Sequence, residues 1–155
     1  MVNKTTESEM AKVVVGTVQL ACEDLESCIR AKIDNGDPRW PPLKPATLAY
    51  KKKIGKEKPL IVTGMMKNAV TNKILIEGGT VKGEVGIWDP VVLEYAPSHE
   101  FGTRDGSIPE RSFIRSTYDE EIDRISADVH EILGDSIEAF WTDRPVKQNK
   151  MKTAK

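Results

Sequence analysis

The chain contains two histidines, each followed by a glutamate, at His99-Glu100 and His130-Glu131. Imidazole and carboxylate groups can exchange protons in general acid–base catalysis, and both can bind metal ions. A zinc site needs three or four ligands, and the sequence has no HExxH motif and no cluster of histidines and cysteines. We therefore expect His99 and Glu100 to orient a loop or contact a partner, with no catalytic, metal-binding or cofactor-binding role.

The other reactive side chains lack the sequence context of a known site. Ser98 and Ser112 do not lie in a GxSxG motif, and Gly55-Lys56 lacks the glycine spacing of a phosphate-binding loop. Cys22 and Cys28 lie six residues apart without CxxC spacing, so we expect no redox or zinc role. Of these two, Cys28 is expected in the core and Cys22 partly covered. The sequence predicts a protein that is not an enzyme.

Charge is segregated along the chain although its formal net charge is only −1. Residues 51–58 form a basic segment with five lysines and one glutamate, a net charge of +4. Residues 119–138 hold eight acids and one arginine, a net charge of −7. This pattern has three interpretations: a head-to-tail contact between identical subunits, contact of the lysines with DNA phosphates, or ordinary solvated faces.

Two long stretches carry apolar residues at spacings of three and four, which is typical of amphipathic helices. The first is expected over residues 7–33, with Gly36 at its left-handed end and Pro38 unable to continue it. The second is expected over residues 116–141. Short helices are predicted over residues 47–54, over residues 63–70 with Thr63 as N-cap, and within residues 91–101.

Residues 71–76 and 81–88 predict two strands, joined by a hairpin turn at residues 77–80. A two-stranded sheet is marginal alone, so it must rest on the helices or on a neighbouring subunit. The predicted class is α+β, with two long amphipathic helices packed on a small antiparallel sheet, short extra helices and long loops. We expect one domain over residues 1–144 and a basic, flexible tail over residues 145–155.

The N-terminal ten residues are polar and lack the apolar region of a signal peptide. No apolar run approaches the roughly 20 residues needed to cross a bilayer. These features predict synthesis in the cytoplasm and no membrane partner. The nearly neutral net charge argues against a protein whose main task is to coat nucleic acid.

Four short motifs follow one another between residues 38 and 116. They are Trp40-Pro-Pro-Leu-Lys-Pro-Ala-Thr-Leu-Ala-Tyr-Lys-Lys-Lys, Pro59-Leu-Ile-Val-Thr-Gly-Met-Met, Tyr95-Ala-Pro-Ser-His-Glu-Phe-Gly-Thr and Ile108-Pro-Glu-Arg-Ser-Phe-Ile-Arg. In this order and spacing, the chain resembles the virion morphogenesis family of tailed phages, also described as tail-completion or head–tail joining proteins. Ser112 departs from the family pattern, which often has proline after the arginine.

The resemblance implies a structural subunit of the head–tail connector, or neck, that forms a ring, expected to be a hexamer. The ring would complete the tail and join it to the head, and the protein would reside in the virion after synthesis in the bacterial cytoplasm. The implied partners are further copies, neighbouring neck, connector and tail-tube proteins, and DNA passing through the channel.

Residues of the motifs are the candidates for the interface or for the turns that support it. They are Trp40, Leu43, Tyr95, His99, Glu100, Gly102, Arg111, Phe113 and Arg115. Arg111 and Arg115 are expected to pair with carboxylates, either Glu100 or the acidic helix of a neighbour. Lysines of the basic segment are candidates for a contact loop: Lys51, Lys52, Lys53, Lys56 and Lys58.

Two other functions stay open at the level of sequence. A tail terminator, which caps the tail tube, needs the same kind of ring with two unlike faces. A small nucleic-acid-binding module would use the basic segment and the basic tail, and its affinity would fall steeply with salt. A metal-dependent enzyme centred on His99 and Glu100 ranks last.

Overall fold

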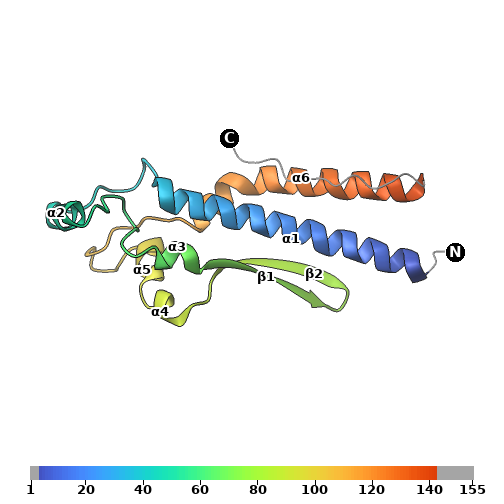
Figure 1. Ribbon diagram of the computed structural model, residues 1–155, viewed down its shortest axis with the longest axis horizontal. Helices are drawn as coiled ribbons and strands as arrows, with labels where there is room; N and C mark the ends of the chain where they lie inside the picture. Colours follow the sequence, from blue (N-terminus) through green and yellow to red (C-terminus); the bar gives the residue numbers. More distant parts are fainter. Residues whose placement is uncertain (1–3, 143–155) are drawn as a thin grey trace.

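The computed structural model describes residues 4–142 and is organised around one long central helix. This helix, α1 (Lys4–Asn35), lies between α6 (Arg115–Trp141), which runs antiparallel to it, and a hairpin of β1 (Val70–Glu77) and β2 (Thr80–Ile87) (Figure 1). The α+β class predicted from the sequence is confirmed. The predicted basic tail over residues 145–155 lies outside the described residues.

Four short helices gather beside the C-terminal end of α1, where α6 begins (Figure 1). They are α2 (Pro45–Lys53), α3 (Met65–Ala69), α4 (Pro90–Leu93) and α5 (Ala96–Phe101). The fully buried side chains of Ile29, Ile33, Val70 and Phe113 meet there and form the main core. The core therefore lies at one end of an elongated molecule, and the chain segments that carry the four motifs surround it.

The end of α1 follows the predicted mechanism. Gly36 adopts a left-handed backbone with φ of 77°, and its N–H donates to the carbonyl of Lys32 at 2.8 Å.

Two ion pairs connect α1 to α6. They join Arg124 to Asp24 (2.7 Å) and Lys32 to Glu120 (2.7 Å). These contacts fix the antiparallel alignment of the two long helices.

The hairpin turn consists of Gly78 and Gly79, which both have positive φ, while Glu77 pairs with Thr80. Two residues of this kind form the turn whose twist matches that of paired strands. Lower on the hairpin, Gly83 faces α1 so closely that a Cβ atom there would overlap Cys22 Sγ. The close approach buries Cys22.

Three local predictions were wrong. Cys22 is the buried cysteine and Cys28 the partly exposed one, because the hairpin covers the face of α1 that carries Cys22. The N-cap of α3 is Gly64, with φ of 82°, and Thr63 precedes it. The range 91–101 holds two helices, because Pro97 can occupy the first turn of a helix but not its interior.

Replacing Gly83 with alanine should lower the free energy of unfolding by about 1–3 kcal/mol, because the added methyl group collides with Cys22 Sγ and lies 3.0 Å from Val18 Cγ1. Gly86→Ala is the matched control on the same strand, because its methyl group would meet only Trp88, at an ordinary 3.7 Å. Urea unfolding of both variants checks the prediction. Equal stability of the two variants would contradict the close packing of the hairpin on α1.

Candidate functional site

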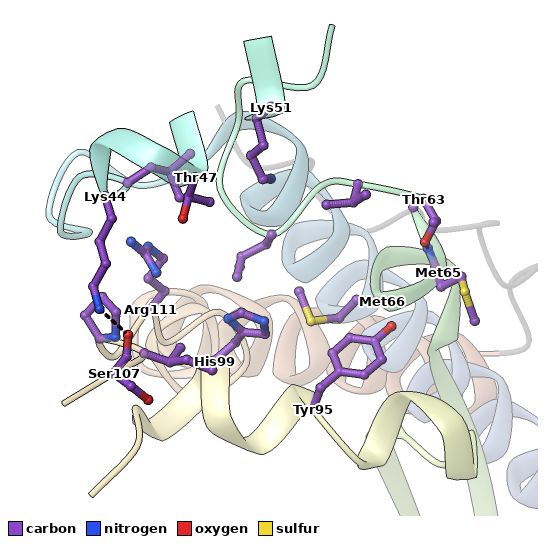
Figure 2. A pocket seen from close by; sticks show the side chains of 16 residues that line it. Lys44, Thr47, Lys51, Thr63, Met65, Met66, Tyr95, His99, Ser107 and Arg111 are labelled. Carbon is purple, nitrogen blue, oxygen red and sulfur yellow. Dashed lines mark hydrogen bonds between the residues drawn. The ribbon is translucent and has the colours of Figure 1, made fainter. Parts of the chain in front are cut away.

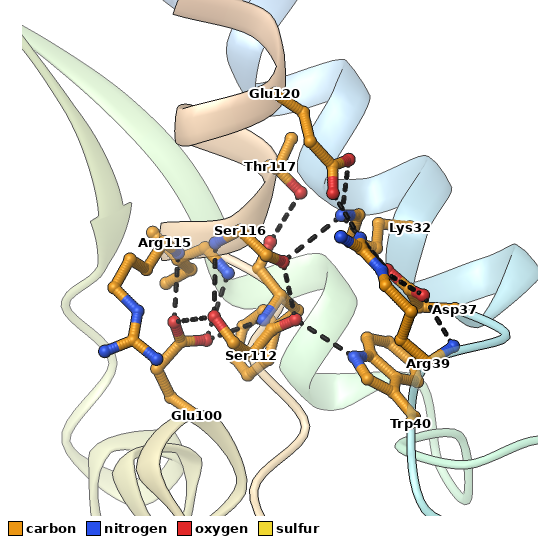
Figure 3. Close-up of polar contacts among 12 residues, drawn as sticks. Lys32, Asp37, Arg39, Trp40, Glu100, Ser112, Arg115, Ser116, Thr117 and Glu120 are labelled. Atoms are coloured by element: carbon orange, nitrogen blue, oxygen red, sulfur yellow. Dashed lines mark hydrogen bonds and ion pairs between the residues drawn. The ribbon is translucent and has the colours of Figure 1, made fainter.

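The carboxylate of Glu100 is the centre of the polar contacts at the start of α6 (Figure 3). Its side chain comes from the last turn of α5, and the residue is only 5% exposed. It accepts hydrogen bonds from Ser112 Oγ (2.8 Å) and from the backbone N–H groups of Phe113 (2.7 Å), Ile114 (3.0 Å) and Arg115 (2.9 Å). An α-helix leaves its first N–H groups without internal partners, so Glu100 caps α6 from a different helix.

Glu100 is held in its ionised form. Burial by itself raises the pKa of the carboxyl, but the hydrogen bonds from three backbone N–H groups and from Ser112 outweigh it and bring the pKa below its usual value. Four donors occupy the two oxygens of this carboxylate. Such a group is suited to fixing the backbone around it.

The guanidinium of Arg111 fastens the proline-rich segment to the same region. Arg111 is 5% exposed and donates to the carbonyl of Pro41 (2.9 Å from Nη2) and to that of Pro42 (3.2 Å). Its backbone N–H donates to the carbonyl of His99 at 2.7 Å. The proline-rich segment forms no helix or strand here, so its carbonyls need donors from elsewhere, and a buried arginine supplies several in a fixed plane.

The predicted pairing of Arg111 with Glu100 is therefore wrong. Glu100 accepts from backbone N–H groups and from Ser112, and Arg111 donates to the carbonyls of the proline-rich segment. The side chain of Arg115 pairs with the exposed Glu110, while its backbone N–H donates to Glu100. A contact of either arginine with a neighbouring copy stays a prediction.

Ser112, the departure from the family pattern, contributes to the cap of α6. Its hydroxyl donates to Glu100 and accepts from the backbone N–H of Ser116 at 3.1 Å. Its carbonyl accepts from the indole Nε1 of Trp40 at 3.1 Å. A proline has no hydroxyl and could not make the first two bonds, so serine strengthens this turn. No motif in the sequence marks Ser112 for this role.

A second polar cluster joins the end of α1 to α6 (Figure 3). Asp37 accepts from the side chain of Arg39, which also contacts Glu120, and Lys32 lies within reach of both carboxylates. The hydrogen bond from Arg39 is the main reason that the pKa of Asp37 is far below its usual range. This cluster fixes the chain as it leaves α1 and enters the proline-rich segment.

A pocket of about 490 Å³ lies between α2, the segment before α3, α5 and residues 107–111 (Figure 2). We call it the basic pocket, because Lys44, Lys51 and Arg111 line it and none of its lining residues within 4–142 is a carboxylate. Leu43, Tyr95 and His99, all predicted site residues, also lie in its wall. Arg111 also lines this pocket, whereas Phe113 and Arg115 belong to the buried cap around Glu100.

Lys51 does not belong to an exposed contact loop, contrary to the prediction. It is 5% exposed, and its ammonium group donates to the carbonyls of Lys58 (2.6 Å) and Ile61 (2.8 Å). Burial, and then the positive charge of Arg111, lower its pKa. Helix α2 places Lys51 on its inner face, whereas the other four lysines of the basic segment are exposed: Lys52, Lys53, Lys56 and Lys58.

His99 and Glu100 do not face each other across a reaction site. His99 lines the basic pocket, and its Nδ1 is buried without a hydrogen-bond partner among the described residues. Burial, and then the charges of Arg111 and Lys51, lower the pKa of His99, which keeps the ring neutral near pH 7. Between residues 4 and 142, no group of three or more histidine, cysteine or acidic side chains is placed to hold a metal ion.

The remaining predicted residues have structural surroundings. Phe113 is fully buried in the core, and Trp40 is partly buried against it. Gly102 has φ of 73°, and a Cβ atom there would lie 2.9 Å from the backbone nitrogen of Glu110, so only glycine fits. Tyr95 stacks edge-on against His99. Tyr95 thus lines the basic pocket, Phe113 and Trp40 belong to the core, and Gly102 shapes the turn after α5.

Comparison of the chain with protein families, with curated proteins and with solved structures finds no match. Within residues 4–142, no helix carries an apolar stretch long enough to cross a bilayer.

Replacing Glu100 with glutamine should lower the free energy of unfolding by about 2–3 kcal/mol, because the amide weakens charge-assisted bonds and presents an N–H to other donors. Glu110→Gln is the matched control: this glutamate is also close to Arg115 but exposed, so its loss should cost less than about 0.5 kcal/mol. Chemical unfolding measures both. Equal decreases in the free energy of unfolding for the two variants would contradict the role of Glu100 in capping α6.

The acid sensitivity of the protein should depend partly on Glu100. Because its pKa is lower in the folded state, the stability it contributes is present above the usual pKa of 4.5 and is lost as the pH falls through the folded value. The difference in unfolding free energy between wild type and Glu100→Gln should be constant above about pH 5.5 and shrink below it. A difference that is unchanged down to pH 3 would contradict an ionised Glu100.

Proposed function

We propose that the chain is a structural subunit of the head–tail connector of a tailed phage, assembling with further copies into a ring that completes the tail and joins it to the head. One observation carries the proposal. The residues of the motifs that resemble the family come together at one end of the molecule, where Glu100, Arg111 and Trp40 bond to backbone groups and fix the shape of several loops. A subunit that works by docking needs such a fixed surface.

Exposed apolar side chains support assembly. Leu93, Phe101 and Tyr118 are 45%, 62% and 47% exposed, and they line one groove of about 350 Å³ on the side of α5 that faces α6. Isolated exposed apolar residues are common, but several around one groove are typical of a surface that another protein covers.

The distribution of charge supports contacts between unlike surfaces. The four exposed lysines of the basic segment lie on or beside α2, at one end of the molecule, and the acidic α6 extends away toward the other end (Figure 1). Complementary charges of this kind steer subunits into one orientation. Within the basic segment, a DNA-binding role would depend on these four lysines, because Lys51 is buried.

Immunogold labelling of purified virions with an antibody to this chain tests the proposal. The expected result is label confined to the head–tail junction, because a connector subunit stays in the finished particle. Virions that carry no label would contradict the proposal. Binding of the purified protein to isolated tails or to isolated heads then distinguishes tail completion from the alternative, a tail terminator.

A further inference from the structure

The basic pocket has the chemistry of a site for an apolar segment that carries negative charge. Its cations are Lys44, Lys51 and Arg111, and the part of the chain that the structure describes contributes no acidic side chain to its lining. Its rim carries Val62 and Met65, which are 44% and 43% exposed. A volume of about 490 Å³ falls within the range of about 300–1,000 Å³ that is typical of pockets that bind ligands.

The donors in the pocket are not exhausted by the contacts within the chain. Lys51 uses two of its three N–H groups on the carbonyls of Lys58 and Ile61. Lys44 is exposed and donates to the carbonyl of Ser107 at 2.9 Å. A carboxylate entering the pocket would therefore meet two ammonium groups without displacing the bonds of Arg111 to the proline-rich segment.

The C-terminal end of α6 has the complementary features. Ile137 and Trp141 are 46% and 74% exposed and are four residues apart, so they lie on one face of the helix. Glu138 is exposed beside them, and Gly134, one turn earlier, leaves the helix surface without a side chain. Two apolar anchors at this spacing, with an adjacent acid, match the way a helix end occupies a groove.

We infer that these two surfaces form one contact between copies of the chain: the last turns of α6 of one subunit dock into the basic pocket of the next. Trp141 and Ile137 fill the apolar part of the pocket, and Glu138 faces Lys44 and Lys51. This inference specifies how the proposed ring is built and so rests on the proposed function.

The positions of the two surfaces suit repeated assembly. The basic pocket lies beside α2, α3 and α5, and the end of α6 lies at the opposite end of the long axis (Figure 1). With a contact between unlike surfaces, every open assembly keeps one unoccupied pocket at one end and one undocked α6 surface at the other. Repetition closes into a ring when the rotation per subunit divides a full turn, and otherwise it continues as a filament.

Cross-linking of mixed cysteine variants of the full chain tests the contact. Met65→Cys places a thiol at the rim of the pocket, and Ile137→Cys places one on the docking face of α6. With a short bis-maleimide reagent, the mixture should give a covalent dimer, and neither variant alone should give the same product. Wild type, which carries Cys22 and Cys28, measures the background.

The matched control is Ile76→Cys, at an exposed position near the tip of the hairpin, mixed with Ile137→Cys. It should give only background cross-linking. The inference is overturned if this mixture reacts as efficiently as the Met65→Cys mixture, or if the Met65→Cys mixture stays at background at protein concentrations of several hundred micromolar.

Sedimentation of charge variants gives a second, independent measurement. Lys44→Glu and Glu138→Lys should each weaken self-association roughly three- to tenfold, and the double variant should recover most of the loss. Trp141→Ala should weaken it more than tenfold without unfolding the subunit, because its side chain is exposed. Single variants that associate like wild type would overturn the contact.

These outcomes separate the contact from the function. Background cross-linking together with label at the head–tail junction would overturn this contact and leave the proposed function standing. Specific cross-linking with no label on virions would support the contact between copies and overturn the proposed function.

Discussion

The buried carboxylate of Glu100 is the interaction on which the rest of the structure depends. It holds the first N–H groups of α6, and the position of α6 in turn determines where Phe113 enters the core and where Ser112 meets Trp40. Arg111 donates in the same way to the carbonyls of the proline-rich segment and holds that segment in place. Removing one partner from such a buried, charged network leaves the others unsatisfied, which costs more than an exposed pair contributes.

The long elements could be predicted from the sequence because their signals are local. The spacing of apolar residues gave both long helices, and Gly36 and the Gly78-Gly79 turn marked the end of α1 and the hairpin. The polar contacts could not be predicted, because their partners are distant along the chain. Arg111 bonds to carbonyls about seventy residues away, and a sequence motif does not say whether a buried arginine will meet a carboxylate or the backbone.

The same reasoning explains why the candidate site was only partly predicted. Leu43, Tyr95 and His99, which come from two of the motifs, all lie in the wall of the basic pocket, and their role in an interface stays a prediction. The burial of Lys51 was not predicted, because three consecutive lysines give no indication in the sequence of which side chain faces the interior. The charged residues of the motifs hold the loops in place through hydrogen bonds to backbone groups. This is consistent with a role in docking and is the basis of the proposed function.

Electron cryomicroscopy of the neck of intact virions would test the central claim most directly, because it would show both the location of the chain and the surfaces that are covered. The account predicts a ring in which this fold repeats at the head–tail junction, with the cap around Glu100 intact in every copy and the basic pocket covered by protein. A neck whose density excludes this fold would contradict the account.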